Sequence, residues 1–275
     1  MSLATASRSE LTKQFTTSIW WILAIALVAY VAFTASVLTF ALSASATGAL
    51  PGAGEAPQAS EEGLPALIYS TATSVGYVFP LLIGTLTVTT EFRHKTLTPT
   101  FLAVPRRGLA LSAKLIVGIA LGALYAVLAI AASVGPGAAI LAGFGLDAEL
   151  TSSDTWALIG RMAIAFVLWV LVGIGVGTVV RNQVVAIVVV LVFTQFLEPV
   201  GRFVAAFVEG LSDFTAYLPG AASDALVGAS VFTAGMGSGA EVTELEWWAG
   251  GLVLLGYALV FLVIGHFTSW RRDVT

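Results

Sequence analysis

Six long apolar stretches dominate the sequence. A helix that crosses the hydrocarbon core of a bilayer needs about 20 apolar residues, because that core is about 30 Å thick. Such stretches occur at 19–42, 64–90, 115–146, 155–180, 184–198 and 247–270. Arg161 interrupts the fourth stretch, and the pair Glu198-Pro199 ends the fifth. The sequence therefore predicts an all-α polytopic membrane protein, with six transmembrane helices in a single domain that covers residues 1–275.

The composition excludes a soluble globular domain. Hydrophobic residues make up 58% of the 275 residues and charged residues only 10%, whereas a soluble domain carries about 25% charged residues. The absence of cysteine excludes disulfides, thiolate metal sites and cysteine nucleophiles. The first apolar stretch follows Arg8 and Lys13, as in a signal peptide. It is longer than the roughly 7–15 apolar residues of a signal peptide, so we interpret it as a retained helix.

The charged residues are sorted by sign between the two sides of the expected membrane. If the six spans alternate with the N-terminus inside, ten of the twelve basic residues lie on the inner side: Arg8, Lys13, Arg93, Lys95, Arg106, Arg107, Lys114, Arg181, Arg271 and Arg272. Thirteen of the sixteen acidic residues then lie toward the outer side: Glu55, Glu61, Glu62, Asp147, Glu149, Asp154, Glu198, Glu209, Asp213, Asp224, Glu241, Glu244 and Glu246. Because cytoplasmic segments collect Lys and Arg, both termini are expected in the cytoplasm.

Two segments outside the spans are predicted to lie at the membrane. Residues 1–18 are polar, but Leu11 and Phe15 are four apart and share a helix face. A short interfacial helix is expected there, with a disordered tail as the alternative. Residues 199–246 alternate short apolar pieces with acidic residues and Pro219-Gly220. We expect re-entrant helices that dip in from outside, because irregular backbone at membrane depth requires protein or water around it; the alternative is an amphipathic surface loop.

The segment 91–108, between the second and third spans, predicts a short helix at the cytoplasmic face. Thr98 can cap a helix whose first residue is Pro99, since proline has no amide hydrogen to leave unbonded there. Pro105 would end this helix. It would present an apolar group framed by arginines, namely Phe101, Leu102 and Val104 between Arg93, Arg106 and Arg107. Such a group suggests a protein partner; the alternative is a basic loop that only follows the positive-inside rule.

Several residues of this segment match the pattern of a known family. They run as an acidic residue, a basic residue, a threonine, apolar residues, a proline with two arginines, and a lysine that opens the third span: Glu91, Arg93, Thr96, Leu102, Pro105, Arg106, Arg107 and Lys114. Two further matching pieces are Leu197-Glu198-Pro199 and Tyr217-Leu218-Pro219-Gly220-Ala221-Ala222. The chain thereby resembles the ABC-2 type permeases, the membrane subunits of many bacterial ABC exporters. The pair His94-Lys95 departs from the pattern, since many relatives have a small residue before the threonine.

The resemblance implies an exporter subunit of the type V fold in a bacterial plasma membrane. Its substrate would be small or amphiphilic, such as a drug, an antibiotic or a lipid-like molecule. It implies a cytoplasmic coupling helix in 91–108, two partner ATPase subunits that bind ATP and Mg, and a second or sister permease, surrounded by lipid and without nucleic acid. The lone carboxylate, Glu91, would hold Arg93, Lys95 or an N-terminal basic residue in place. The ATPase-coupling residues would be Glu91, Arg93, Thr96, Phe101, Leu102, Val104, Pro105, Arg106 and Arg107.

The chain itself has no recognisable ATPase site. A phosphate-binding loop requires a lysine after glycine in G-x-x-x-x-G-K-[ST], and none of Lys13, Lys95 and Lys114 follows a glycine. We expect no catalytic residue, cofactor or metal in this chain. The fourth span contains Gly173, Gly175 and Gly177, and close helix packing explains this run better than a nucleotide fingerprint does. Close packing also explains Gly118 and Gly122 in the third span.

Three ionisable residues near membrane depth are further candidates, because such residues are often functional. Arg161 can extend outward from the fourth span. Glu198 and Arg202 are four apart and are expected to pair along a helix, with a contact to substrate as the alternative. A secondary transporter or channel that works without ATP is the competing function. It predicts internal repeats or charged relay residues near the bilayer midplane, and neither is evident in the sequence.

Overall fold

The computed structural model describes residues 2–49, 63–96, 107–208, 210–236, 243 and 245–270, and the regular elements in these ranges are all helices. Six helical stretches are long and apolar enough to cross a membrane: Ile19–Ala46, Leu64–Arg93, Gly108–Gly143, Ser153–Val179, Gln183–Ala205 and Trp247–Thr268. The predicted all-helical architecture with six candidate spans is therefore confirmed.

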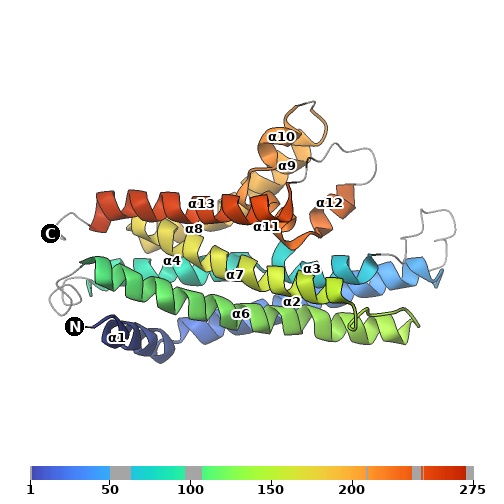
Figure 1. Ribbon diagram of the computed structural model, residues 1–275, viewed down its shortest axis with the longest axis horizontal. Helices are drawn as coiled ribbons and strands as arrows, with labels where there is room; N and C mark the ends of the chain where they lie inside the picture. Colours follow the sequence, from blue (N-terminus) through green and yellow to red (C-terminus); the bar gives the residue numbers. More distant parts are fainter. Residues whose placement is uncertain are drawn as a thin grey trace.

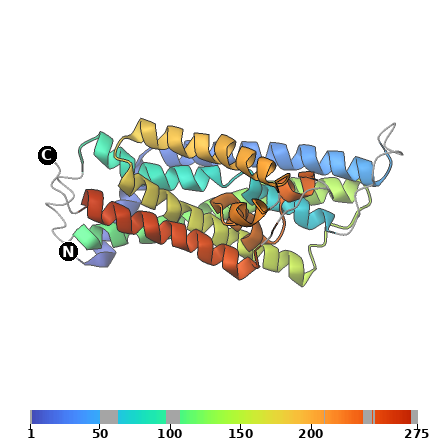
Figure 2. The same ribbon diagram turned by 90° about the horizontal axis from the view of Figure 1, so that it is seen from above.

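The spans run side by side along the length of the molecule, except that the fifth leaves the bundle at its last turns (Figures 1 and 2). In chain order the elements that form them are α2 (Ile19–Ala46), α3 (Leu64–Ser74) with α4 (Val78–Arg93), α6 (Arg107–Gly143), α7 (Ser153–Val179), α8 (Gln183–Val192) with η2 (Phe193–Leu197) and α9 (Glu198–Ala205), and α13 (Trp247–Gly265) with η3 (His266–Trp270). Helix α1 (Leu3–Thr16) lies at the same end of the bundle as the last turns of α13 (Figure 1). We call this the terminal end.

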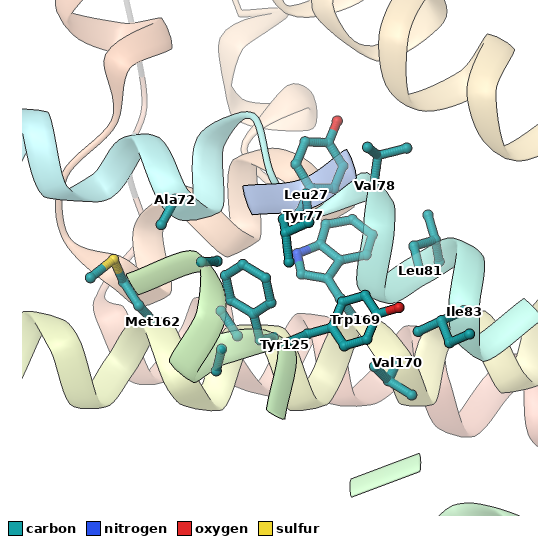
Figure 3. Close-up of a cluster of buried hydrophobic side chains, with 14 of the residues drawn as sticks. Leu27, Ala72, Tyr77, Val78, Leu81, Ile83, Tyr125, Met162, Trp169 and Val170 are labelled. Carbon is teal, nitrogen blue, oxygen red and sulfur yellow. The ribbon is translucent and has the colours of Figure 1, made fainter. Parts of the chain in front are cut away.

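Helices α3, α4 and α7 form the centre of the bundle. In the most apolar 18 residues of each span, 67% of the second span and 61% of the fourth are buried inside the bundle. The corresponding share is 22% for each of the fifth and sixth spans. Three aromatic side chains, Tyr77, Tyr125 and Trp169, lie among aliphatic ones at the centre of this bundle and come from three different spans (Figure 3). The rings of Tyr77 and Trp169 lie 4.6 Å apart. The outer spans thus leave most of their apolar surface uncovered by this chain, which suits a lipid environment or a partner.

Glycines allow α4 and α7 to touch through their backbones. A side-chain carbon on Gly84 would collide with the carbonyl oxygen of Val170, and one on Gly173 with the carbonyl oxygen of Leu81. Gly177 similarly faces the backbone of Thr85. Small residues permit such close approach between membrane helices. The interpretation of the glycines in the fourth span as packing positions is confirmed by this geometry.

Two of the spans are irregular. The second span breaks between α3 and α4, at Val75–Tyr77. The fifth contains the π-helical segment η2, where the N–H of Glu198 bonds the carbonyl of Phe193, five residues earlier. Pro199 follows at once and has no N–H to offer to the ladder, and a π turn is a common way to absorb such an interruption. The expected end of this span at Glu198 is wrong, because the helix continues through the proline to Ala205.

Short helices fill the region between the fifth and sixth spans. Beyond α9 they are α10 (Ser212–Thr215), α11 (Pro219–Val227) and α12 (Val231–Met236). Figure 1 shows α9 and α10 standing away from the other helices, whereas α11 packs against α13, α7 and α3. The apolar piece that begins at Phe203 is therefore the end of the fifth helix rather than a helix of its own.

Candidate functional site

Four charged side chains meet at the terminal end of the bundle. The ammonium group of Lys114, in α6, lies 2.7 Å from Oε2 of Glu10 in α1 and 2.8 Å from Oε1 of Glu91 in α4. Lys13 Nζ lies 2.7 Å from Glu10 Oε1 and 3.2 Å from Glu91 Oε1. We call these four residues the charge cluster. It ties α1 to the parts of α4 and α6 that lie on either side of residues 97–106 in the chain.

Counted over the described residues, the charge cluster holds two positive and two negative side chains and is largely shielded from solvent. The side chain of Lys114 is only 1% exposed, whereas that of Lys13 is 41% exposed. Burial alone would raise the pKa of Glu10, but the ammonium groups of Lys114 and Lys13 outweigh it and hold this pKa below 4.5. Burial would likewise lower the pKa of Lys13, but the carboxylates of Glu91 and Glu10 raise it above 10.5. Both residues of α1 are therefore charged at neutral pH.

Glu91 is the one expected coupling residue that the charge cluster contains. Of the three partners expected for it, the structure shows an N-terminal basic residue, Lys13, together with the lysine of the third span. The other carboxylate oxygen, Oε2, is buried, and no described residue forms a hydrogen bond with it. A pocket of about 320 Å³ adjoins the cluster and extends along α4 to Thr96. Space therefore remains beside Glu91 at the start of the loop.

The remaining expected coupling residues are only partly covered by the structure. Arg93 Nη1 lies 3.5 Å from Oε1 of Gln183, which links α4 to α8. Thr96 donates its N–H to the carbonyl of Glu91 at 3.0 Å. Arg107 begins α6, with its backbone alone described. The central residues lie outside the described part of the chain, namely Phe101, Leu102, Val104, Pro105 and Arg106.

A second site forms where the irregular parts of the second and fifth spans meet α11. It encloses a cavity of about 190 Å³, which we call the polar cavity. The break in the second span supplies Ser74 and Tyr77, and Tyr77 donates its hydroxyl to the carbonyl of Thr194 in η2 at 2.9 Å. The π turn leaves this carbonyl free, because the N–H of Glu198 bonds Phe193 instead. Two local departures from α-helix thus create one polar junction.

Glu198 caps α11 from another helix. Pro219 is the first residue of α11, and the preceding Leu218 has no side chain that could accept the next free amides. Glu198 Oε1 accepts the N–H groups of Gly220 at 2.5 Å and Ala221 at 3.2 Å. A side-chain carbon on Gly220 would lie 2.5 Å from that oxygen, so the contact requires glycine. Glu198 Oε2, however, is buried and has no partner among the described residues.

Arg202 pairs with Asp224 rather than with Glu198. Its Nη2 lies 2.8 Å from Asp224 Oδ2, which also accepts from the hydroxyl of Ser230 at 2.7 Å. Asp224 Oδ1 lies 3.4 Å from the Ser74 hydroxyl. The expected pairing of Glu198 with Arg202 is therefore wrong. The reason lies in the tertiary structure. Glu198 accepts hydrogen bonds from the backbone amides of α11, and the Asp224 carboxylate of the same helix lies within reach of the Arg202 guanidinium.

The polar cavity contains two of the three predicted intramembrane residues. Arg161 does not line it: its Nε bonds the carbonyl of Ala157 at 3.4 Å, and its guanidinium lies against Gly228, at the end of α11. Asp224 was not singled out from the sequence, although an acidic residue inside an apolar piece is itself a signal. Tyr77 carried no such signal, because its role depends on η2.

A hydrogen bond connects the polar cavity to the core of the bundle. Trp169, at the centre of α7, donates its indole N–H to the hydroxyl of Ser223 at 3.0 Å. Its ring contacts the tilted ring of Tyr77, and Tyr77 lines the cavity (Figure 3). A displacement of α11 would therefore disturb the most buried part of the bundle.

The comparisons with known proteins add no family assignment. No model of a known protein family matches the chain, and no curated protein matches it.

Proposed function

We propose that this chain is the permease subunit of an ATP-driven ABC exporter that moves a small or amphiphilic substrate across a bacterial plasma membrane. The observation that carries the proposal is the charge cluster at the terminal end. It joins α1, α4 and α6 at the two ends of the segment whose sequence resembles a coupling loop. A push on that loop by a partner ATPase would reach the spans through these ion pairs.

In this proposal, α1 is the interfacial helix, 91–108 is the cytoplasmic coupling segment, and α11 with its neighbours is the re-entrant region. The terminal end then faces the cytoplasm, so that both chain termini are inside. A second copy or a sister permease covers the exposed apolar faces of the first and fifth spans, and two ATPase subunits bind ATP and Mg. Closure of the ATPase dimer would open the transport path outward.

The test is capture of the ATPase by tagged permease variants, combined with substrate-stimulated ATP hydrolysis. Phe101→Ala should release or uncouple the ATPase more severely than Arg107→Ala, because truncation of a buried aromatic anchor costs about 2 kcal/mol or more of binding and rim charges cost less. Glu91→Gln should lower transport and leave assembly largely intact. Wild-type capture and coupling by Phe101→Ala would refute the coupling role of this loop.

Two further measurements address orientation and assembly. A reporter that is active only in the cytoplasm should give signal when fused to Thr275 and none when inserted at 52–62; the reverse result would overturn the topology. Crosslinking in membranes should trap a pair of permeases, and a functional complex with one permease would contradict the assembly.

A secondary transporter is the second candidate, and the polar cavity favours it. Glu198 and Asp224 are both buried carboxylates that line this cavity, and Arg202 pairs with Asp224. Charged relays of this kind occur in transporters driven by ion gradients. Transport into proteoliposomes that contain the permease alone, driven by a proton gradient without ATP, would support this candidate and refute the exporter.

A further inference from the structure

We propose that the polar cavity binds the protonated amine of a small amphiphile, with Oε2 of Glu198 as the acceptor. Among the described residues, five titratable side chains face this cavity: Tyr30, Tyr77, Glu198, Arg202 and Asp224. Their charges, and the hydrogen bonds they already make, determine which ligand the cavity can take.

The charge of Asp224 is already compensated. Arg202 forms an ion pair with it, and hydroxyl groups of Ser74 and Ser230 complete its partners. The guanidinium of Arg202 also lies 4.1 Å from the centre of the Phe232 ring. This pair contributes no net charge to the cavity.

Glu198 is left with one oxygen that no described residue satisfies. The residue is 2% exposed, lines the cavity and uses Oε1 for the two amides of α11. In the part of the chain that the structure describes, Oε2 has no hydrogen-bond partner. Leaving a buried polar group unpaired costs about 1–3 kcal/mol, and more if it is charged. As a carboxylate, Oε2 lacks a donor, and the cavity then carries one net negative charge. A ligand with a positively charged N–H group meets both needs.

The walls of the cavity suit the rest of an amphiphile. The rings of Tyr30, Tyr77 and Phe232 surround the polar groups, and aromatic faces attract cations. Tyr30 is 41% exposed, so the cavity reaches the surface of the bundle beside it. The volume of about 190 Å³ is more than tenfold the roughly 10–15 Å³ that one water needs. An ammonium group with a short apolar body fits these features better than an anion or a sugar.

The test uses purified full-length permease in detergent, without ATPase or ATP. Equilibrium dialysis compares radiolabelled benzylamine, which is charged at neutral pH, with benzyl alcohol, which has the same body and no charge. The wild-type protein should bind the amine at least about tenfold more tightly, since a charge-assisted hydrogen bond contributes about 1.5–3 kcal/mol. Equal affinity for the two probes would overturn the proposal and indicate a cavity filled by water.

Variants then locate the site. Glu198→Gln keeps an oxygen for the α11 amides and should lose at least about tenfold in amine affinity, with little change for the alcohol. Glu198→Asp keeps the charge and should keep the preference for the amine. Glu246→Gln, at an exposed carboxylate before α13, is the matched control and should change neither. Amine binding by Glu198→Gln as tight as by wild type would refute the role of Glu198.

A second position protects the test against a folding defect in Glu198→Gln. Tyr30 is partly exposed, so Tyr30→Leu should fold and should weaken amine binding about two- to fivefold through loss of a cation–π contact of about 0.5–1 kcal/mol. An unchanged amine affinity there would place the amine elsewhere. Identification of the amine as a transported substrate rests on the proposed function, but the binding does not. Failure to capture an ATPase would refute the exporter while leaving these results intact.

Discussion

The charge cluster and the polar cavity both bury ionisable groups, but they satisfy them in different ways. Among the described residues of the charge cluster, two carboxylates are matched by two ammonium groups. In the polar cavity, two carboxylates face a single arginine, and backbone amides and hydroxyls supply the other hydrogen bonds. One carboxylate oxygen in each region, on Glu91 and on Glu198, has no hydrogen-bond partner among the described residues. A balanced cluster suits a rigid joint, whereas an unbalanced cavity suits a binding site.

The largest effect is expected from removing the buried ammonium group of the charge cluster. Lys114→Met leaves Glu10 and Glu91 facing each other with Lys13 alone, and should lower the free energy of unfolding by about 3–5 kcal/mol. Lys13→Met is the matched control. It removes a half-exposed lysine while Lys114 remains, and should cost about 1 kcal/mol or less. Thermal unfolding of both purified variants measures the difference; equal losses would mean that burial does not distinguish the two lysines.

Breaking the ion pair of the polar cavity should cost less. Arg202→Met leaves Asp224 with two hydroxyl donors, so the loss should be about 1.5–3 kcal/mol, as for a hydrogen bond to a charged group. Arg202→Lys keeps the charge and should lose only part of this. If Arg202→Met is as destabilising as Lys114→Met in the same unfolding assay, the hydroxyls do not relieve Asp224 and the contrast between the two regions disappears.

The contact between Glu198 and α11 can be tested through glycine. Gly220→Ala places a carbon against Glu198 Oε1 and should destabilise by about 1–3 kcal/mol through overpacking. Gly201→Ala in α9 is the matched control, because its new carbon would meet nothing within 4 Å. Alanine is the better helix former by about 0.5–1 kcal/mol, so this variant should be neutral or stabilised. Unfolding curves in which both variants behave alike would contradict the close approach.

The smallest effect is expected from pH, and it concerns the charge cluster. The folded pKa of Glu10 is below its ordinary value of 4.5, so its contribution to stability is present above that value and is lost as the pH falls through the folded pKa. Lys13 has a raised pKa, so its contribution is present below 10.5 and is lost as the pH rises through the folded pKa. Melting temperature measured against pH should fall on both sides. Glu10→Gln should flatten the acid side, and an unchanged acid profile would show that Glu10 is not responsible.

Both regions were only partly predictable from the sequence. The notable charges of the terminal end were visible, because Glu91 and Lys114 flank one loop and the N-terminal segment is basic. Their meeting with Glu10 was not, since nothing local brings residue 10 to residue 114. In the polar cavity, Glu198 and Arg202 stood out as ionisable residues near membrane depth. Their spacing suggested a pair along one helix. Both instead bind α11, because Glu198 accepts the free amides at its start and Arg202 pairs with its Asp224 carboxylate.

The sequence by itself determined the number, type and approximate bounds of the spans, since long apolar runs with little charge have no stable alternative to helices in an apolar solvent. It also determined which glycines could be contact points, because only small residues allow backbones to touch. The tertiary structure alone decided that Pro199 sits within the fifth helix, that a π turn frees the carbonyl of Thr194 for Tyr77, and that Glu198 caps α11 with one oxygen and leaves the other unpaired. These outcomes depend on which helices lie side by side, and a hydrogen bond between residues far apart in the chain leaves no local pattern by which it could be read.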